Sequence, residues 1–501
     1  MVDLGGAAMT VGVVGSGAMG AGIAQVALTG GMRVVLHDAN SEALGKARDS
    51  LFARLDRLVE KNEATSADMA AAKGRLTLAR GLEDFASCQV VVEAIVENLD
   101  AKRELFRALE AIVPAETILA SNTSSLPIAS IAQACRDRRR VAGMHFFNPV
   151  PLMKLVEIVR AADTAPDVTA ALMDLGRRMG RTPVLVKDGP GFLVNLGGRA
   201  YTSEALHILQ ENVATIDDVD AVMRECCGFR MGPFELMDLT GLDVSYPASR
   251  IMHEGYFFDP RLKMTPQMES QFRAGRFGRK SGTGFYRYDA GGKRIDARPA
   301  AVEVGMPPAR VVLAETDDRL VSFAVAAGAD ISAHDDGASP ILLAPLGEDC
   351  TTAALRLGVD VRRAVAIDLT HEIGKRVTIM AAPGADPAAL DAVDAMLRKT
   401  GRAVTRIKDS PGFIAQRMTA MVANLGCEIA QMGLASPADI DTAMRLALNY
   451  PSGPLALADK MGVAATYAIL CRLQEITGSD RYRPSLWLRR RAMLNLSASV
   501  A

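Results

Sequence analysis

The sequence contains few of the residues that would indicate a disulfide-stabilised, metal-binding or nucleic-acid-binding protein. Its 501 residues include seven cysteines, which form no Cys-x-x-Cys pair and show no spacing typical of metal ligands. Lys plus Arg (57) nearly balance Asp plus Glu (58), so there is no bulk charge to attract nucleic acid or an anionic membrane. We therefore expect no metal and no nucleic-acid partner.

Long apolar runs are also missing. No segment approaches the roughly 18 apolar residues that a membrane-spanning helix needs. Residues 1–9 lack the cationic start and apolar core of a signal peptide. We therefore expect no membrane partner and a cytoplasmic protein, in which the vicinal pair Cys226-Cys227 is reduced. With 49% hydrophobic residues, a chain of this length predicts two to four domains.

Residues 10–38 have the pattern of a dinucleotide-binding fold. A strand at 11–14 leads into Gly15-Ser16-Gly17-Ala18-Met19-Gly20, and a helix at 21–28 and a strand at 33–38 follow. Gly15 permits the tight turn, Gly17 the close approach of a pyrophosphate, and Gly20 the packing of helix on strand. The helix N-terminus then offers free N–H groups to the phosphates. Glycines and elements in this order are far more specific than the glycines alone.

Asp38 ends the second of these strands, about 20 residues beyond the glycines, where the ribose-binding acid of such folds lies. Its carboxylate would accept from ribose hydroxyls and repel a 2′-phosphate. Ala39 and Asn40 supply no cation to bind that phosphate. The pattern therefore favours NAD over NADP. The alternative is that Asp38 caps the helix that follows.

Four further strands are expected at 89–94, 116–121, 140–146 and 154–159, with a helix at 99–112 between the first two. Strands alternating with helices predict an α/β Rossmann-type, doubly wound, mostly parallel sheet. Another helix, around 44–58, carries a row of Arg54, Arg57 and Lys61. That row is either a solvated face or a contact for the phosphates of a large anionic substrate.

The segment 141–159 places an imidazole and a carboxylate on two neighbouring apolar runs. VAGMHF contains His145, KLVEIV contains Glu157, and an Asn-Pro-Val-Pro turn separates them. A hairpin at that turn brings the two side chains within hydrogen-bonding reach. A carboxylate beside an imidazole fixes its tautomer and makes it a better proton acceptor. Downstream of a nucleotide signature, this pair favours a general base over a structural contact.

After Lys187-Asp-Gly-Pro-Gly-Phe192 the alternation stops, and long helical stretches run to about residue 280. They predict an all-α domain, with Asn195 facing the cleft beside it. The chain now resembles the 3-hydroxyacyl-CoA dehydrogenases over roughly residues 10–290. The motifs that carry this resemblance are GSGAMG, VVEAIVEN, ASNTSSL, HFFNPVPLMKLVEIV, KDGPGF, MGPFELMDLTGLD and FGRKSGTGFYRY.

The resemblance implies NAD-dependent, reversible oxidation of an (S)-3-hydroxyacyl-CoA to the 3-ketoacyl-CoA. It implies His145 as general base, Glu157 as its partner, and Ser124 and Asn195 on the substrate oxygens. The positions where the family contacts NAD are Gly15, Ser16, Gly17, Ala18, Met19, Gly20, Asp38, Glu97, Lys102, Asn148 and Lys280. Lys61, with Arg54 nearby, falls near a CoA contact. One residue departs from the pattern: Leu196 stands where the family commonly has Arg.

The chain also contains an internal duplication at an offset of 221 residues. KDGPGF at 187–192 recurs as KDSPGF at 408–413, and DVDAVM at 218–223 recurs as DIDTAM at 439–444. We therefore expect five segments. They are the NAD-binding domain at 1–187, the helical domain at 188–286, a linker at 287–309, a degenerate, truncated α/β segment at 310–407 and a second helical domain at 408–501.

The copy lacks the residues with chemical roles: Gln416 replaces Asn195, and Thr378 falls near the position of Glu157. We hypothesise one active site and an internal pseudo-dimer of the two helical domains, with a further homodimer left open. His371 as a second base is the alternative. Two other classes compete: short β-hydroxyacid dehydrogenases with a lysine base, and non-catalytic NAD-binding proteins. Both 3-hydroxybutyryl and 3-hydroxyadipyl thioesters fit as substrates.

Overall fold

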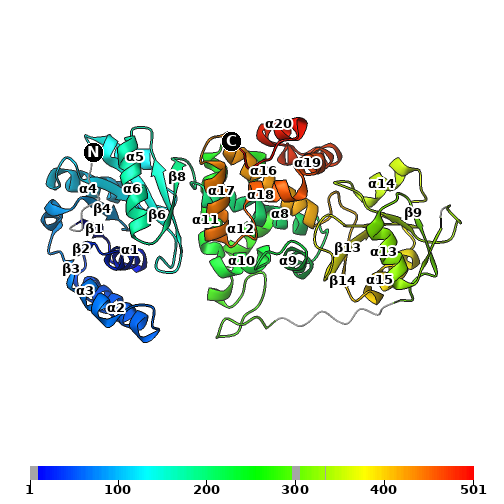
Figure 1. Cartoon of the computed structure of the whole chain (residues 1–501), viewed down its shortest axis with the longest axis horizontal. Coiled ribbons are helices and arrows are strands. Elements are labelled where there is room, and N and C mark those ends of the chain that lie inside the picture. Colours follow the sequence, from blue (N-terminus) through cyan, green and yellow to red (C-terminus); the bar gives the residue numbers. More distant parts are fainter. Residues whose placement is uncertain (1–8, 296–304, 333, 501) are drawn as a thin grey trace. The chain divides into compact units, whose positions relative to one another are not determined.

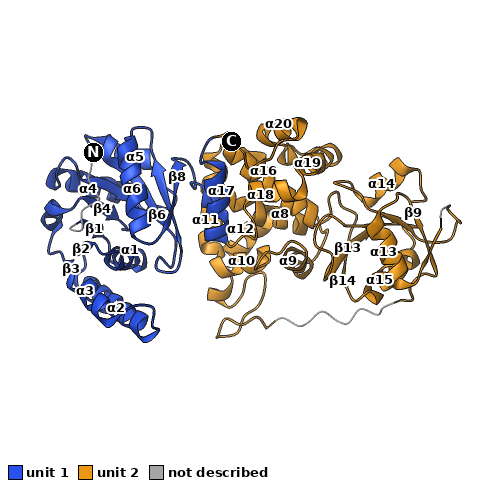
Figure 2. Cartoon of the chain, viewed as in Figure 1, with its two compact units in different colours: residues 1–196, 433–448 blue, residues 197–432, 449–501 orange. Residues whose placement is uncertain are grey.

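The computed structural model describes residues 9–295, 305–332 and 334–500 (Figure 1). Residues 1–8, and residues 296–304 within the expected linker, lie outside the described residues. The chain divides into two compact units (Figure 2). Unit 1 comprises Met1–Leu196 and Gly433–Leu448, and unit 2 comprises Gly197–Met432 and Asn449–Ala501. The five segment boundaries given above stay predictions.

Unit 1 is built on an eight-stranded sheet with the order β3-β2-β1-β4-β5-β6-β7-β8. Neighbouring strands are parallel, except that β6 and β7 form an antiparallel hairpin. The predicted Rossmann-type fold is confirmed. The strands are β1 (Thr10–Val14), β2 (Arg33–His37), β3 (Leu76–Leu78), β4 (Val90–Glu93), β5 (Ile118–Ser121), β6 (Val141–Phe146), β7 (Leu155–Arg160) and β8 (Thr182–Lys187).

Helices cover the sheet, and polar side chains cap the starts of some of them. Asn40 accepts from the amides of Glu42 and Ala43 at the start of one helix, and Asn98 caps another. The α-helices are α1 (Ala18–Thr29), α2 (Ser41–Glu60), α3 (Ser66–Gly74), α4 (Leu99–Ile112), α5 (Ile128–Ala132), α6 (Pro166–Arg178) and α7 (Val194–Gly197). Single 3-10 turns lie at Leu82–Ser87 and Arg138–Arg140.

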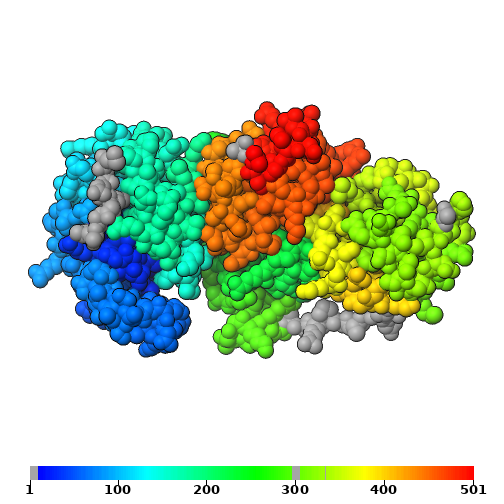
Figure 3. Space-filling view, viewed as in Figure 1, coloured from blue at the N-terminus to red at the C-terminus, as the bar shows by residue number. Residues whose placement is uncertain are grey.

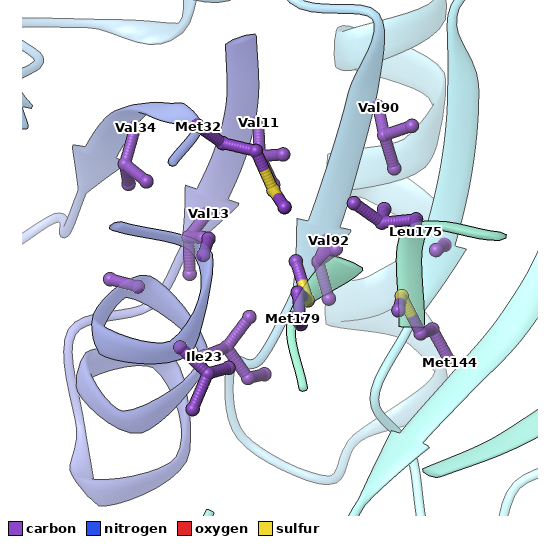
Figure 4. Close-up of a cluster of buried hydrophobic side chains, with 14 of the residues drawn as sticks. Val11, Val13, Ile23, Met32, Val34, Val90, Val92, Met144, Leu175 and Met179 are labelled. Atoms are coloured by element: carbon purple, nitrogen blue, oxygen red, sulfur yellow. The ribbon is translucent and has the colours of Figure 1, made fainter. Parts of the chain in front are cut away.

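The core of unit 1 lies between the central strands and these helices. Val11 and Val13 of β1 and Val92 of β4 are buried against Ile23 of α1 and Leu175 of α6 (Figure 4). Buried parallel strands read as continuous apolar runs because both faces are covered. That is why VGVV and QVVVEA were recognisable from the sequence.

One helix of unit 1 comes from the second copy. α17 (Pro437–Leu448) belongs with the sheet that is formed by residues 10–187, and it packs against β7 and β8. In the space-filling view of Figure 3, residues 437–448 fall in the orange part of the colour bar and β7 and β8 in its cyan to green part. The sequence marked this stretch as a repeat of DVDAVM, but gave no sign of where it packs.

Unit 2 holds the remaining helices of both copies. Those of the first copy are α8 (Arg199–Gln210), α9 (Ile216–Glu225), α10 (Pro233–Thr240), α11 (Leu242–Gly255) and α12 (Pro266–Arg273). Those of the second copy are α16 (Ala415–Gln431), α18 (Pro454–Met461), α19 (Val463–Thr477) and α20 (Leu486–Leu494). Short 3-10 turns lie at Pro260–Leu262, Arg279–Ser281 and Asp480–Tyr482. α8 and its repeat α16 pack directly against each other.

A second, six-stranded sheet completes unit 2, with the order β10-β9-β11-β12-β13-β14. Its strands are β9 (Arg310–Leu313), β10 (Asp330–Ser332), β11 (Ile341–Leu343), β12 (Ala364–Ile367), β13 (Arg376–Ala381) and β14 (Ala403–Ile407). Its helices are α13 (Asp318–Ala327), α14 (Cys350–Leu357) and α15 (Pro387–Lys399). β12 and β13 again form an antiparallel hairpin. This sheet has fewer strands than the sheet of unit 1, but it keeps the antiparallel hairpin.

Among the described residues, no single helix is long and apolar enough to cross a membrane. α18 and α19 meet the length and composition criteria only as a pair, and they are bent by 95° at the break between them.

Candidate active site

The glycine-rich loop between β1 and α1 has the geometry that its sequence predicts. Gly15 has φ +99°, and a Cβ there would lie 2.5 Å from the carbonyl oxygen of Ala94. A Cβ on Gly20 would lie 1.8 Å from the oxygen of Gly15, so the first turn of α1 packs closely on the loop. A Cβ on Gly17 would meet no atom within 4 Å, which leaves space at the helix N-terminus. These features fit a bound pyrophosphate.

Asp38 follows β2 and is held in place by the loop. Its Oδ2 accepts hydrogen bonds from the amide and the hydroxyl of Ser16, both at 2.8 Å. Burial alone would raise the pKa of Asp38, but hydrogen bonds from the amides of Asn40 and Ser16 outweigh it and hold the pKa below its ordinary value. An ionised carboxylate therefore stands beside the space that the glycines leave.

A cavity of about 540 Å³ opens beside Asp38. Its lining is mostly apolar, which suits one face of an adenine ring. The lining residues are Val14, Gly15, Gly17, His37, Asp38, Ala39, Leu82, Ala94, Ile95, Val96 and Leu105. Loop, carboxylate and cavity together fit NAD.

His145 and Glu157 lie directly opposite each other in the β6–β7 hairpin. Nδ1 of His145 is 2.6 Å from Oε2 of Glu157, and both side chains are buried. With an ionised Glu157, Nδ1 carries the proton and donates, so Nε2 is left as the nitrogen that can accept one. The rings of Phe147 and Phe192 lie 4.6 Å and 5.7 Å from the imidazole and restrict its rotation.

The other oxygen of Glu157 is also occupied. Oε1 accepts from the amides of Leu193 and Val194, at 3.1 Å and 2.8 Å. These amides belong to the PGFLVN turn, so the motif after β8 holds the carboxylate as well as presenting Asn195. Sequence reasoning missed this role, because backbone donors carry no residue signature.

The loop after β5 is organised by Glu97. Oε1 of Glu97 accepts from the hydroxyls of Thr123 and Ser125 and from the amide of Ser124. Burial would raise the pKa of Glu97, but the Thr123 hydroxyl and the Lys102 ammonium lower it below the ordinary value. Glu97 therefore fixes the loop that presents Ser124, which is itself exposed.

Lys102 is buried between two carboxylates rather than facing solvent. Its Nζ lies 2.5 Å from Glu93 and 3.2 Å from Glu97, and its side chain is 1% exposed. Glu93 also accepts from the hydroxyl of Ser121. Sequence reasoning did not single out Glu93, because a charged residue within an apolar strand gives no hint of its partner.

Asn195 lies close to the same loop, and its Nδ2 donates to the carbonyl oxygen of Ser124 at 3.3 Å. Ser124, His145, Glu157 and Asn195 all belong to unit 1. A further bond joins the elements: the side-chain oxygen of Asn122 accepts from the amide of Phe146, next to His145. The predicted catalytic set is thus carried by one connected group of strands and loops.

Other predicted residues are placed less centrally. Nε of Arg54 donates to Gln25 of α1 at 2.7 Å, while Lys61 is exposed at the end of α2. Asn148 is exposed in the turn after β6. Lys280 lies in unit 2, where its ammonium is 2.7 Å from Asp243.

The corresponding hairpin of the second copy carries different chemistry. The amide of Asp368 donates to the carbonyl oxygen of Thr378, so these two residues take the hairpin positions of His145 and Glu157. Gln416, at the position of Asn195, is fully buried and bonded to Gly347, Pro345 and Asp368. Its hydrogen-bonding groups are therefore used within the protein.

Fold and site together define a dehydrogenase that uses NAD. The model of the 3-hydroxyacyl-CoA dehydrogenase NAD-binding domain matches residues 10–189. The model of the C-terminal domain of the same family matches twice, at 191–288 and 412–497. The chain belongs to the 3-hydroxyacyl-CoA dehydrogenase family.

Two relatives and one solved structure illustrate the likeness. The 3-hydroxyadipyl-CoA dehydrogenase of Escherichia coli is 37% identical over 97% of this chain and 98% of its own length. A crystal structure of 3-hydroxybutyryl-CoA dehydrogenase from Escherichia coli is also 37% identical, covers 97% of this chain and 98% of its own, and has a TM-score of 0.85. The human mitochondrial hydroxyacyl-coenzyme A dehydrogenase is 40% identical over 55% of this chain and 90% of its own length.

Proposed function

We propose that the protein oxidises (S)-3-hydroxyacyl-CoA thioesters reversibly to 3-ketoacyl-CoA in fatty or aromatic acid catabolism, with His145 as the general base. The observation that carries the proposal is the buried contact between His145 Nδ1 and Glu157. It leaves Nε2 of His145 free to take the proton of the 3-hydroxyl group. Bound NAD would accept the hydride that leaves C3.

Glu157 has two tasks in this scheme. Its Oε2 offsets the positive charge that His145 gains, and its Oε1 ties the pair to the amides of Leu193 and Val194. Ser124 and Asn195 orient the substrate oxygens, since a misplacement near 1 Å can cost about 100-fold in rate. Glu97 and Lys102 hold the loop of Ser124, in addition to the NAD contacts that the family pattern implies for them and for Asn148 and Lys280.

Arg54 and Lys61 of α2 are proposed to meet the phosphates of CoA. The pKa of Arg54 lies below its ordinary value because of burial and the neighbouring Arg57. The positive charges of Arg54 and Arg57 repel each other, and a bound phosphate would offset that repulsion.

The second copy is proposed to act as a built-in partner rather than as a second site. Arg417 of α16 and Arg481 reach Glu204 of α8, at 2.6 Å and 2.7 Å, and all three side chains are buried. The helices α8 and α16 also pack directly against each other, as the core-like halves of an obligate subunit interface do. We propose an internal pseudo-dimer of the two helical copies, which leaves a further homodimer to be measured.

A 3-hydroxyadipyl thioester is the second candidate substrate. It is favoured by the relative of that name, which matches the chain over both copies. Steady-state oxidation of 3-hydroxybutyryl-CoA, longer 3-hydroxyacyl-CoA esters and 3-hydroxyadipyl-CoA tests both candidates. A kcat/KM for the dicarboxylic ester well above the others supports the second candidate. No NAD reduction with any of them contradicts the proposal.

A further inference from the structure

The outer edge of the unit 1 sheet lies one strand away from Glu157. β8 is the last strand in the order, and it pairs in parallel with β7, placing Glu157 opposite Val184. The amides of Thr182 and Asp188 donate towards β7, to Lys154 and Arg160. Because backbone groups alternate along a strand, the amides of residues 183, 185 and 187 point to the outer edge.

These three outward positions are all accounted for within unit 1. Residue 183 is a proline and has no N–H group to satisfy. The amide of Lys187 donates to the carbonyl oxygen of Leu434 at 2.8 Å. The carboxylate of Asp439 lies near the amide of Leu185, which lowers the pKa of that carboxyl against the larger opposing effect of burial. An edge that would otherwise stay open is therefore closed by the segment 433–448 of the second copy.

The segment 433–448 packs against the sheet with buried apolar side chains. Leu434, Ile440, Ala443 and Met444 are buried, and α17 packs against β7 as well as β8. A Cβ on Gly433 would lie 3.1 Å from Nζ of the Lys187 side chain, so this side chain also lies against the segment. Figure 2 shows α17 in the colour of unit 1 although its neighbours in sequence belong to unit 2.

The equivalent contact, with the roles of the two copies exchanged, occurs in unit 2. β14 is the last strand of the second sheet, and the amide of Lys408 donates to the carbonyl oxygen of Val213 at 3.0 Å. Lys408 and Leu434 lie 221 residues after Lys187 and Val213, the offset of the duplication. α9 follows Val213 and packs against β13. Each copy therefore lends this segment to the sheet of the other copy.

We propose that Asp439 and the backbone of Leu434 are positioning groups for catalysis. These two groups hold β8 in place. Because β8 pairs with β7, it also sets the position of β7, which carries Glu157 opposite His145. The inference rests on the proposed role of that pair. It assigns to the second copy a direct part in the geometry of the active site, beyond its packing on the helical domain.

Asp439→Ala in the full-length protein tests the proposal, with hydrogen exchange and steady-state kinetics measured on the same sample. We expect the Leu185 amide to lose protection and kcat to fall about tenfold, with the KM for NAD unchanged, since small misplacements of a catalytic pair are costly. Asp439→Asn should restore both, because its amide oxygen still accepts from Leu185. Asp439→Ser, which suits a helix N-terminus, serves as the milder variant where the alanine protein folds poorly.

Asp218→Ala is the matched control. Asp218 is the counterpart of Asp439 in α9, where it forms a capping box with Thr215. Asp218→Ala should lower the free energy of unfolding, as the loss of a helix cap does, but should leave kcat unchanged. Faster exchange at Leu185 with an unchanged kcat, or an equal loss of kcat in the control, overturns the positioning role. Wild-type turnover in His145→Gln would instead contradict the proposed function, while leaving the exchange result intact.

Discussion

The two α/β regions of this chain share a hairpin but differ at the positions of the proposed catalytic pair. In one, His145 faces Glu157; in the other, Asp368 faces Thr378. The difference extends to the nucleotide loop. Gly17 leaves α1 open to phosphate, whereas the side chain of Asp317 caps α13 and places a carboxylate where an anion would bind. The comparison teaches that the same strand arrangement can carry different side chains at the positions proposed for catalysis.

The largest expected effect separates the two histidines. His145→Gln should lower kcat about 100- to 10,000-fold, because the proton acceptor is lost while NAD and substrate still bind. His371→Gln, in the second region, should keep wild-type turnover. Steady-state NADH formation measures both. Substantial turnover in the first variant, or a large loss in the second, would show that the two regions do not differ as proposed.

The ion cluster that joins the copies gives the next effect. Glu204→Gln should lower the free energy of unfolding by about 3 to 5 kcal/mol, since buried Arg481 loses its carboxylate and buried Arg417 keeps only Glu211. Leu425→Met, at the repeat position of Glu204, conserves volume and should cost less than about 1.5 kcal/mol. Denaturant titration of both variants checks this, and equal losses would refute it.

The same cluster predicts a pH dependence. Burial alone would raise the pKa of Glu204, but Arg481 and Arg417 together outweigh burial and lower this pKa to about 2. Because this pKa lies below the ordinary 4.5, the stabilisation is complete above about pH 4.5 and is lost as pH falls towards 2. The gap in Tm between wild type and Glu204→Gln should therefore narrow between pH 5 and pH 3. A constant gap would argue against the cluster.

Glu157→Gln should lower kcat about 10- to 100-fold, less than the loss at His145, because a neutral amide still orients the imidazole but cannot offset its charge. Thr378→Val is its counterpart in the second region and should leave kcat unchanged. Rapid-mixing measurement of the hydride-transfer step is the direct test. An unchanged rate in Glu157→Gln would reduce the carboxylate to a structural contact.

The smallest effect concerns the cofactor. Asp38→Ala should raise the KM for NAD about tenfold, as expected for loss of a hydrogen bond to a charged group, and should reduce discrimination against NADP. Asp317→Ala, at the α13 cap, should change neither value. Calorimetric titration should give one NAD per chain. Two equivalent sites would mean that the second sheet also binds the nucleotide.

The hairpin and the nucleotide loop could be predicted because their signals are local. Glycine spacing, an Asn-Pro-Val-Pro turn and apolar runs on either side determine which residues meet, without knowledge of the rest of the chain. Position 145 and position 157 are only a few residues from the turn that joins them. Short-range geometry of this kind is readable from sequence.

Other features depend on contacts that sequence order hides. The burial of Lys102 requires Glu93 and Glu97 to converge on it, and charged residues are ordinarily expected at the surface. The bond from the amide of Lys187 to the carbonyl oxygen of Leu434 joins residues of different copies. β3, with two half-buried leucines and one exposed threonine, has too little pattern to be recognised.

The unequal sharing of charge between the repeats has a consequence for the separated halves. Glu204 lies in the first copy and both of its arginines in the second, while Leu196 and Pro260 occupy the matching places in the first. Two detached front halves brought together in the same way would each bury an acid with no cation to meet it. A dimer of front halves alone would therefore be less stable than the present chain, in which both copies are joined.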